Sequence, residues 1–385
     1  MICRDQWMTL PNSFGPLFFV DWRIEIMSYQ LANAHTSHTP WALIGPTGVT
    51  GGMILERALA LGHRPHLIGR DPAKLTALAK PAGLSWSAVD IGDKAALCAA
   101  LEGQKLVLNA AGPFAITAPP VIAAALASGV DYLDLNGELL TLEALFDRDA
   151  DAKAAGVALI GGVGFGIAAS DGLAMQVAAL LGGADSMRIA VAADSGFGSP
   201  AVAESTVSVI AAGGHEVHKG SLVRARLARR RWIERDPSGA VHSFASAPLA
   251  DLAATRRIAG VRNITAGVPM PRGQARILSI IAPLLPTMLK FGPIRRAMAN
   301  AGGHAGAART TYASRVWVTA RRGKRTASAR LDAGEGFACT VDIALAAIAA
   351  TLRNRPASGA HSPATAFGAD FITGVPGISI VINPA

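Results

Sequence analysis

A glycine-rich turn constrains the fold of this chain more than any other stretch. It lies within WALIGPTGVTGG, residues 41–52, whose first four residues are mostly apolar and predict a short buried strand. A helical pattern follows, so the strand turns into a helix N-terminus through Gly45, Gly48 and Gly51. A helix N-terminus offers unpaired N–H groups and the positive end of a dipole, and glycines let the backbone approach an anion closely. The stretch therefore predicts a cradle for a phosphate group.

The spacing of these glycines is G-x-x-G-x-x-G, which differs from the usual dinucleotide fingerprint G-x-G-x-x-G. Thr47 and Thr50 would add hydroxyl donors beside the glycines. A tight strand-to-helix turn without any ligand gives the same local sequence. The glycines alone therefore leave both interpretations open, and the rest of the chain has to decide between them.

Strands and helices alternate along the next part of the chain, as they do in a doubly wound parallel sheet. The stretch at 106–109 is almost continuously apolar, which suits a parallel strand that is buried on both faces. The predicted fold class is α/β, with a Rossmann-like doubly wound parallel sheet. Its six strands are expected near residues 41–44, 64–70, 84–89, 106–109, 131–135 and 157–160.

The end of the second expected strand indicates which dinucleotide would bind. An acidic residue at this place favours NAD by accepting the ribose 2′-hydroxyl, whereas an arginine favours the 2′-phosphate of NADP. Arg70 stands there, with Lys74 one helical turn further on, so we expect NADP(H). Asp71 leaves two alternatives open, because it could reach the ribose or cap a helix that starts at Pro72.

Two more strand ends complete the expected cofactor path. Asp90 follows the third strand, where an acidic residue would lie near the adenine. The fourth strand ends in Asn109-Ala-Ala-Gly112-Pro113, and small residues there would let the pyrophosphate and the nicotinamide ribose pass over the sheet edge.

The second half of the chain follows another pattern. Strands are expected there without regular crossover helices, which predicts a second, α+β domain with a more antiparallel sheet. The expected strands are 187–193, 314–320, 326–331 and 377–382, and the expected helices are 201–212, 277–298 and 342–353.

Charge also divides the chain. Residues 188–335 carry 23 Lys and Arg against 8 Asp and Glu, whereas residues 41–187 carry 9 against 14. Such an asymmetry suggests two domains that meet different partners. We expect an NADP-binding Rossmann domain at 41–185, completed by about 340–385, and a basic domain for substrate binding or dimerisation at 186–339.

Residues 1–40 are expected to form a flexible extension, and Met27 is an alternative start of the protein. The apolar run at 16–20 is too short for the core of a signal peptide. Cys3, Cys98 and Cys339 are scattered and form no C-x-x-C pair, so neither a disulfide framework nor a cysteine zinc site is indicated. We expect a cytoplasmic protein, with peripheral membrane attachment as an alternative.

Six motifs carry a family resemblance: GPTGVTG, LIGRDPAKL, VLNAAGPF, GVDYLDLNGE, GFGIAASD and SPATAFGADF. Together they resemble the saccharopine dehydrogenase-like reductases, in the branch that includes trans-acting enoyl reductases. The pattern departs from the family after Phe165, where relatives usually carry an acidic residue and a proline. The resemblance implies a Rossmann domain that binds NADP(H) through Gly45, Thr47, Gly48, Val49, Thr50, Gly51, Arg70, Asn109, Ala111, Gly112 and Pro113.

The candidate catalytic residues follow the fifth expected strand. Tyr132 and Asp134 point to one side of that strand, and Glu138 comes after a tight Asn-Gly turn. Strand ends of a parallel sheet face the ligand crevice, so a carboxyl group there could move a proton while the nicotinamide delivers hydride. The favoured alternative is that Glu138 caps the next helix or pairs with a base.

Other chemistries have less support. None of Tyr29, Tyr132 and Tyr312 is followed four residues later by lysine, which excludes the Tyr-Lys mechanism of short-chain reductases. His215 and His218 are three residues apart without a visible third ligand, so no metal is expected.

Two stretches of the basic half suggest partners. Residues 224–235, RARLARRRWIER, hold six arginines, but the interleaved aromatics of a nucleic-acid surface are missing and nucleic acid is not expected. The apolar stretch 277–289, with arginines and lysine around it up to residue 296, could lie at a membrane interface, line an acyl-binding groove or form a domain or homodimer core.

These observations favour an NADP(H)-dependent oxidoreductase that transfers hydride to a C=C or C=N bond of a small-molecule or acyl, lipid-like substrate. Two alternatives remain open at this stage. One is a non-enzymatic NADP(H)-binding sensor, because the catalytic signal is weak. The other is a membrane-surface lipid-binding protein that uses the cofactor structurally.

Overall fold

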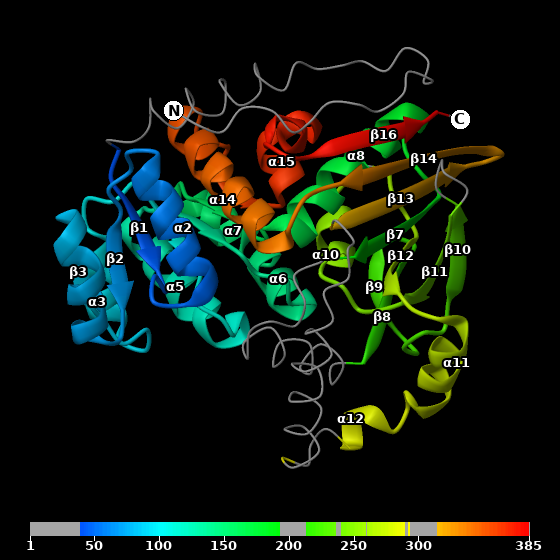
Figure 1. Ribbon diagram of the computed structural model, residues 1–385, viewed down its shortest axis with the longest axis horizontal. Helices are drawn as coiled ribbons and strands as arrows, with labels where there is room; N and C mark the ends of the chain where they lie inside the picture. Colours follow the sequence, from blue (N-terminus) through cyan, green and yellow to red (C-terminus); the bar gives the residue numbers. More distant parts are fainter. Residues whose placement is uncertain are drawn as a thin grey trace, which may run out of the picture.

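The computed structural model describes residues 39–192, 213–235, 240–258, 260–288, 292 and 314–384, and it is shown in Figure 1. These residues form two sheets, each covered by its own helices. The expectations for residues 1–38, and for a helix at 201–212, lie outside the described residues.

The first sheet is parallel throughout and has the strand order β15-β6-β5-β4-β1-β2-β3. The six strands expected from the sequence are confirmed. A seventh, β15, comes from near the end of the chain and pairs with β6. The strands are β1 (Trp41–Ile44), β2 (His66–Gly69), β3 (Trp86–Ala88), β4 (Leu106–Asn109), β5 (Asp131–Asp134), β6 (Ala158–Ile160) and β15 (Gly359–His361).

Each face of this sheet has its own core, because successive side chains of a strand point to opposite sides. Trp41 and Leu43 pack with the side of the sheet that α2 and α14 cover, whereas Ala42 and Ile44 pack with the side of α4 and α5. The helices of this part are α2 (Val49–Ala60), α3 (Pro72–Ala79), α4 (Lys94–Leu101), α5 (Phe114–Ser128), α6 (Leu139–Phe146), α7 (Asp149–Ala155) and α14 (Gly336–Arg353), with a 3-10 turn η1 (Lys80–Ala82).

Helix α14 is the one helix in the described part of the chain that is long and apolar enough to cross a membrane. Many of its apolar residues, among them Leu345 and Ile348, are buried in the core beneath α2. The Asp342 carboxylate also lies 3.5 Å from the Arg57 guanidinium of α2. Helix α14 is therefore a core helix of the parallel-sheet part.

The second sheet is mixed, and among its described pairings only β7–β12 is parallel. This arrangement confirms the expected α+β part. Its main path is β10-β11-β12-β7-β13-β14-β16, and β8 joins it through β12 with β9 beside it. The strands are β7 (Ser186–Ala192), β8 (Gly214–His218), β9 (Ser221–Ala225), β10 (Arg231–Arg235), β11 (Val241–Ser246), β12 (Ile264–Pro269), β13 (Arg315–Arg322), β14 (Arg325–Asp332) and β16 (Ser379–Asn383).

The chain passes between the two sheets through η2 (Phe165–Ala169), a π-helical turn, and α8 (Ser170–Leu181), which packs on β13 and β14. Near the C-terminus, β15 belongs to the parallel sheet whereas β16 pairs with β14 of the second sheet. The last part of the chain therefore contributes one strand to each sheet. The remaining helical elements are α10 (Asp251–Thr255), α11 (Arg272–Ile281), α12 (Leu285–Met288), α15 (Pro363–Phe367) and η3 (Ala369–Gly374). The helix expected from residue 277 thus starts earlier, at Arg272, and stops at Ile281 before Pro283.

Candidate functional site

The glycine turn between β1 and α2 has the close backbone approaches that its sequence predicts. Gly45 has a φ of 81°, which a side chain would disfavour, and its N–H donates to the Ile68 carbonyl of β2 at 3.1 Å. A Cβ atom on Gly51 would overlap the carbonyl oxygen of Gly45, so only glycine fits where the helix crosses the turn. The glycines therefore hold the start of α2 directly against the end of β1.

The start of α2 is open to a ligand. Gly48 is its N-cap, and among the described residues no side chain caps this end and no acidic residue lies in its first turn. Thr47, Gly48 and Val49 are exposed, Val49 with 60% of its surface. Because the N–H groups and the dipole of a helix start attract anions, this surface fits the pyrophosphate of a dinucleotide.

At the end of β2, Asp71 and Arg70 differ in whether their side chains are engaged within the protein. The Asp71 carboxylate accepts the N–H groups of Ala73 at 3.0 Å and Lys74 at 3.1 Å, and Pro72 is the first residue of α3. Asp71 is thus the helix cap that one of the two sequence interpretations foresaw. Arg70 is exposed and, within the described chain, has no ion pair, whereas Lys74 lies 3.8 Å from Asp71.

The other cofactor candidates lie along the same edge of the sheet. Asp90 is exposed just beyond β3 and accepts the Gly92 N–H at 2.8 Å. Gly112 and Pro113 are exposed after β4, and a Cβ on Gly45 would stand 3.0 Å from that of Ala111, so the ends of β1 and β4 lie together. The parallel sheet therefore brings the predicted cofactor residues to one edge.

Asn109 begins a buried hydrogen-bond chain at this edge. Its side-chain amide donates to the Tyr132 hydroxyl at 3.3 Å, and that hydroxyl donates to Asp134 Oδ2 at 2.9 Å. Asp134 Oδ1 accepts the N–H groups of Asn136 at 3.0 Å and Gly162 at 2.8 Å. The chain thus joins the ends of β4, β5 and β6.

Both members of this chain that were candidate catalysts are wholly buried: Tyr132 and Asp134 each have 0% of their surface exposed. Burial raises the pKa of Asp134 to about 6, although the N–H donors of Gly162 and Asn136 lower it, and burial also raises the pKa of Tyr132. These hydrogen bonds give both residues a structural role, which is to hold the strand ends in place. A catalytic role for them stays a prediction.

Glu138, the third candidate catalyst, is the N-cap residue of α6 by position, but its side chain caps α5 and makes no cap bond to α6. Its two carboxylate oxygens accept the N–H groups of Phe114 at 3.0 Å and Ala115 at 2.9 Å, at the start of α5. The Thr141 hydroxyl also donates to it at 3.1 Å. The carboxylate therefore fills the helix start beside the Gly112-Pro113 loop.

We expect Glu138→Ala to lower the free energy of unfolding by about 1–2 kcal/mol, because two N–H groups lose their acceptor. Glu138→Gln keeps one acceptor and should lose less than half of that. Urea unfolding of both variants measures the effect, with Glu56→Ala on the exposed side of α2 as the control. A Gln variant that is as stable as the wild type but loses all turnover would instead make Glu138 a catalyst.

Two buried carboxyl groups, which no sequence motif indicates, lie near each other between α8 and α10. Asp171 of α8 and Asp251 of α10 are 0% and 3% exposed. Asp171 Oδ2 accepts the Ala364 N–H at 2.9 Å, whereas Oδ1 of each residue lacks a partner within the described chain. Desolvation raises the pKa of each to about 6, and the charge of Asp171 adds to the effect on Asp251. The two residues are far apart in sequence, so no local pattern signals the pair.

This pair predicts a stability that falls as the pH rises. The pKa of Asp251 is about 6 in the folded protein against 3.8 ordinarily, so the folded state holds its proton more tightly and loses stability as the pH rises through this range. Asp251→Asn does not titrate and should be about 2–3 kcal/mol more stable than the wild type at about pH 7.5, with no advantage at about pH 4. Chemical unfolding at both pH values tests this, and Asp147→Asn, an exposed position, is the control. An equal effect at both pH values would contradict it.

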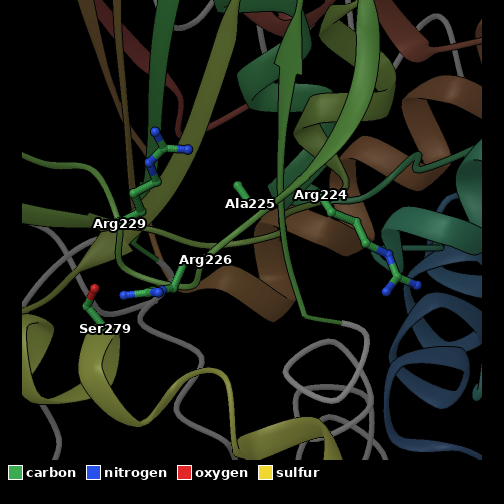
Figure 2. A pocket seen from close by; sticks show the side chains of 5 residues that line it. All are labelled: Arg224, Ala225, Arg226, Arg229 and Ser279. Carbon is green, nitrogen blue, oxygen red and sulfur yellow. The ribbon is translucent and has the colours of Figure 1, made fainter.

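The two cavities that we describe lie in the second sheet and not at the glycine turn. One has about 400 Å³ and is lined by Arg224, Ala225, Arg226, Arg229 and Ser279 (Figure 2). The other has about 370 Å³ and lies beside it, around Arg188, Arg230 and Trp232. Among the residues described, no group of three His, Cys, Asp or Glu is placed to hold a metal ion.

The comparisons with known proteins concern chiefly the parallel-sheet part. Residues 41–160 match the sequence profile of the saccharopine dehydrogenase NADP binding domain. A probable mitochondrial saccharopine dehydrogenase-like oxidoreductase of Arabidopsis thaliana is 31% identical over 140 residues, which are 32% of this chain and 31% of that protein. A trans-acting enoyl reductase of Mycobacterium leprae is 33% identical over 138 residues, 34% of this chain and 33% of that protein.

The alignments thus span about a third of the length of these curated relatives. The fold extends further. The apo structure of saccharopine dehydrogenase (L-Glu forming) from Saccharomyces cerevisiae superposes with a TM-score of 0.57 at 12% identity, over 90% of this chain and 100% of that one. The family resemblance, the NADP(H) cofactor and the Rossmann-like fold expected from the motifs are confirmed. Residues 41–160 are therefore similar to the NADP binding domain of saccharopine dehydrogenase, and beyond them the likeness to the solved saccharopine dehydrogenase is one of fold.

Proposed function

We propose that the protein is an NADP(H)-dependent oxidoreductase that transfers hydride between the nicotinamide and a C=C or C=N bond. The observation that carries this proposal is the open edge of the parallel sheet. There the uncapped start of α2, the exposed Arg70 and the Gly112-Pro113 loop lie at the ends of adjacent strands. The names of the relatives, saccharopine dehydrogenase-like oxidoreductase and trans-acting enoyl reductase, support the same class of reaction.

Each part of this edge would have a separate task. The N–H groups at the start of α2 would bind the pyrophosphate, and Arg70 would pair with the 2′-phosphate. The buried chain of Asn109, Tyr132 and Asp134 would hold the neighbouring strand ends rigid, so that the cofactor path keeps its shape. The bound cofactor supplies hydride, and the protein orients it and excludes water.

The described strand ends offer no exposed acid that is free of partners, since Asp134 is buried and Glu138 caps α5. The substrate would then take its proton from water or from a group that closes over the site. This arrangement also suits a sensor that binds NADP(H) without turnover, and we keep that as the second candidate.

The free thiols Cys98 and Cys339 suit a reducing compartment, and we propose the cytoplasm.

NADPH carrying deuterium at C4, in each of its two stereochemical forms, tests the proposal. The protein would be incubated with enoyl thioesters and cyclic imines, and the products analysed by mass spectrometry. We expect deuterium to enter one substrate class from one of the two forms. Tight NADPH binding without transfer to any member of either class would favour the sensor instead.

A further inference from the structure

Helix α11 and the turn after it have two apolar faces, and one of them packs against the second sheet within the described part of the chain. Ala275, Ala282 and Leu285 are buried in small clusters against the second sheet. On the other side, Ile277 is 62% exposed, Ile280 69% and Leu284 62%. Ile281 and Met288 are exposed as well, at 41% and 43%.

The three exposed isoleucines share one side of α11. Ile277, Ile280 and Ile281 stand at positions i, i+3 and i+4 of α11, and the exposed Leu284 and Met288 follow in the turn and in α12. Single exposed apolar side chains are ordinary on a protein surface, but a contiguous group of large ones marks an interaction site. Figure 1 shows α11 and α12 projecting from the second sheet, away from the glycine turn between β1 and α2.

Arginines border this apolar face. Arg272 and Arg276 lie on α11 itself, and the 400 Å³ cavity joins α11 to the loop after β9 through Ser279 and Arg226. In Figure 2 the side chains of Arg226 and Ser279 approach each other from the two elements, whereas Arg224 points away. In the part of the chain that is described, Arg226, Arg272 and Arg276 form no ion pair, so their charges remain available to an outside anion.

Charge decides which partner suits such a face. A second copy of the chain would bring the same arginines against these, in a segment that carries 23 Lys and Arg against 8 Asp and Glu. An anionic lipid bilayer offers acyl chains for the isoleucines and phosphates for the arginines. We propose that α11, α12 and Arg226 form a membrane-binding face that docks the protein on anionic bilayers, with Ile277, Ile280 and Leu284 inserted at the interface.

Vesicle flotation of the full-length protein tests this face. We expect binding to vesicles of phosphatidylcholine mixed with phosphatidylglycerol, no binding to phosphatidylcholine alone, and weaker binding as salt is added, since counterions screen the arginines. Absence of binding to the anionic vesicles at low salt would overturn the proposal.

Matched variants distinguish binding through this face from non-specific hydrophobic adsorption of the protein to vesicles. Ile280→Ser with Leu284→Ser should weaken vesicle binding at least about tenfold, because two apolar side chains no longer leave water. The control Leu140→Ser with Leu180→Ser removes two other exposed leucines, at 51% and 41% exposure, and should bind like the wild type. Equal binding by the two double variants would contradict the proposal.

The arginines have their own pair of variants. Arg226→Gln with Arg276→Gln should weaken binding about tenfold at low salt and reduce its salt dependence. The control Arg64→Gln with Arg353→Gln removes two exposed arginines at other places and should leave binding unchanged. NADPH binding should be the same in all four variants, which shows that each is folded. A concentration-dependent dimer that the apolar variant abolishes, without vesicle binding, would assign the face to a second copy instead.

Discussion

Alanine at Gly51 should weaken NADPH binding at least about 30-fold, whereas alanine at the neighbouring Gly52 should leave the affinity unchanged. A Cβ on Gly51 would overlap the Gly45 carbonyl oxygen, which is backbone and cannot swing away. A Cβ on Gly52 would meet only the Pro46 carbonyl oxygen, at an ordinary 3.5 Å. The two residues are consecutive in the first turn of α2, and both variants add the same methyl group to this helix. A difference between them therefore reports the close approach of the backbone at Gly51 and not the helix propensity of alanine.

The two variants should differ in stability as well as in binding. We expect Gly51→Ala to lose about 2–4 kcal/mol of unfolding free energy and at least about 30-fold in NADPH affinity, because the helix start moves away from the strand end. Gly52→Ala should gain up to about 1 kcal/mol, because alanine favours the helix. Urea unfolding and calorimetric titration with NADPH measure both quantities.

If Gly51→Ala does not fold, Gly48→Ala still tests the cradle. A Cβ there would meet the Gly45 carbonyl oxygen at 3.4 Å, so the turn can accept it, but the methyl group would stand on the exposed start of α2. A folded Gly48→Ala variant should bind NADPH more weakly. Unchanged affinity in both the Gly48 and Gly51 variants would show that the pyrophosphate lies elsewhere.

Arg70→Gln should remove the preference for NADPH over NADH. The Arg70 side chain is exposed at the end of β2, and Asp71 beside it is engaged in capping α3, so Arg70 is the group placed for a 2′-phosphate. A charge-assisted hydrogen bond to phosphate predicts a loss of about 10- to 100-fold in NADPH affinity. NADH, which has a free 2′-hydroxyl, should bind equally to the variant and to the wild type.

The matched control for this variant is Arg64→Gln, which removes another exposed arginine just before β2. It should leave the affinities for both nucleotides unchanged. Competition titrations with NADPH and NADH give the ratio directly. An equal loss of affinity for NADPH and NADH in Arg70→Gln would contradict the assignment of the 2′-phosphate to this residue.

The parallel sheet could be predicted from the sequence because its central strands β1, β4, β5 and β6 are buried along their whole length. Strands such as β4 are then continuous apolar runs, and the glycine turn fixes where the first of them ends. Strand β15 could not be found in this way, because Gly359–His361 has no apolar run and gains its place only by pairing with β6. In the second sheet, the arginine-rich stretch 224–235 divides between β9 and β10, which a run of arginines does not reveal.

Among the site residues, too, local contacts could be predicted from the sequence and long-range contacts could not. The Asp71 cap is local, and Asp-Pro before a helix predicts it. Glu138 caps α5 from more than twenty residues further along the chain, so sequence favoured the nearer helix instead. The pair of Asp171 and Asp251 forms only when α8 and α10 pack together at the junction of the two sheets. Contacts of this range depend on the folded topology, and no spacing in the sequence encodes them.

Hydrogen–deuterium exchange of the full-length protein with and without NADPH tests the location of the cofactor most directly. We expect NADPH to slow exchange in residues 45–53, 69–74 and 109–116, which lie at the ends of β1, β2 and β4. Residues 224–232 and α11 should exchange at the same rate in both samples. Protection centred on that arginine-lined cavity, with none at the glycine turn, would contradict the assignment of the NADP(H) site.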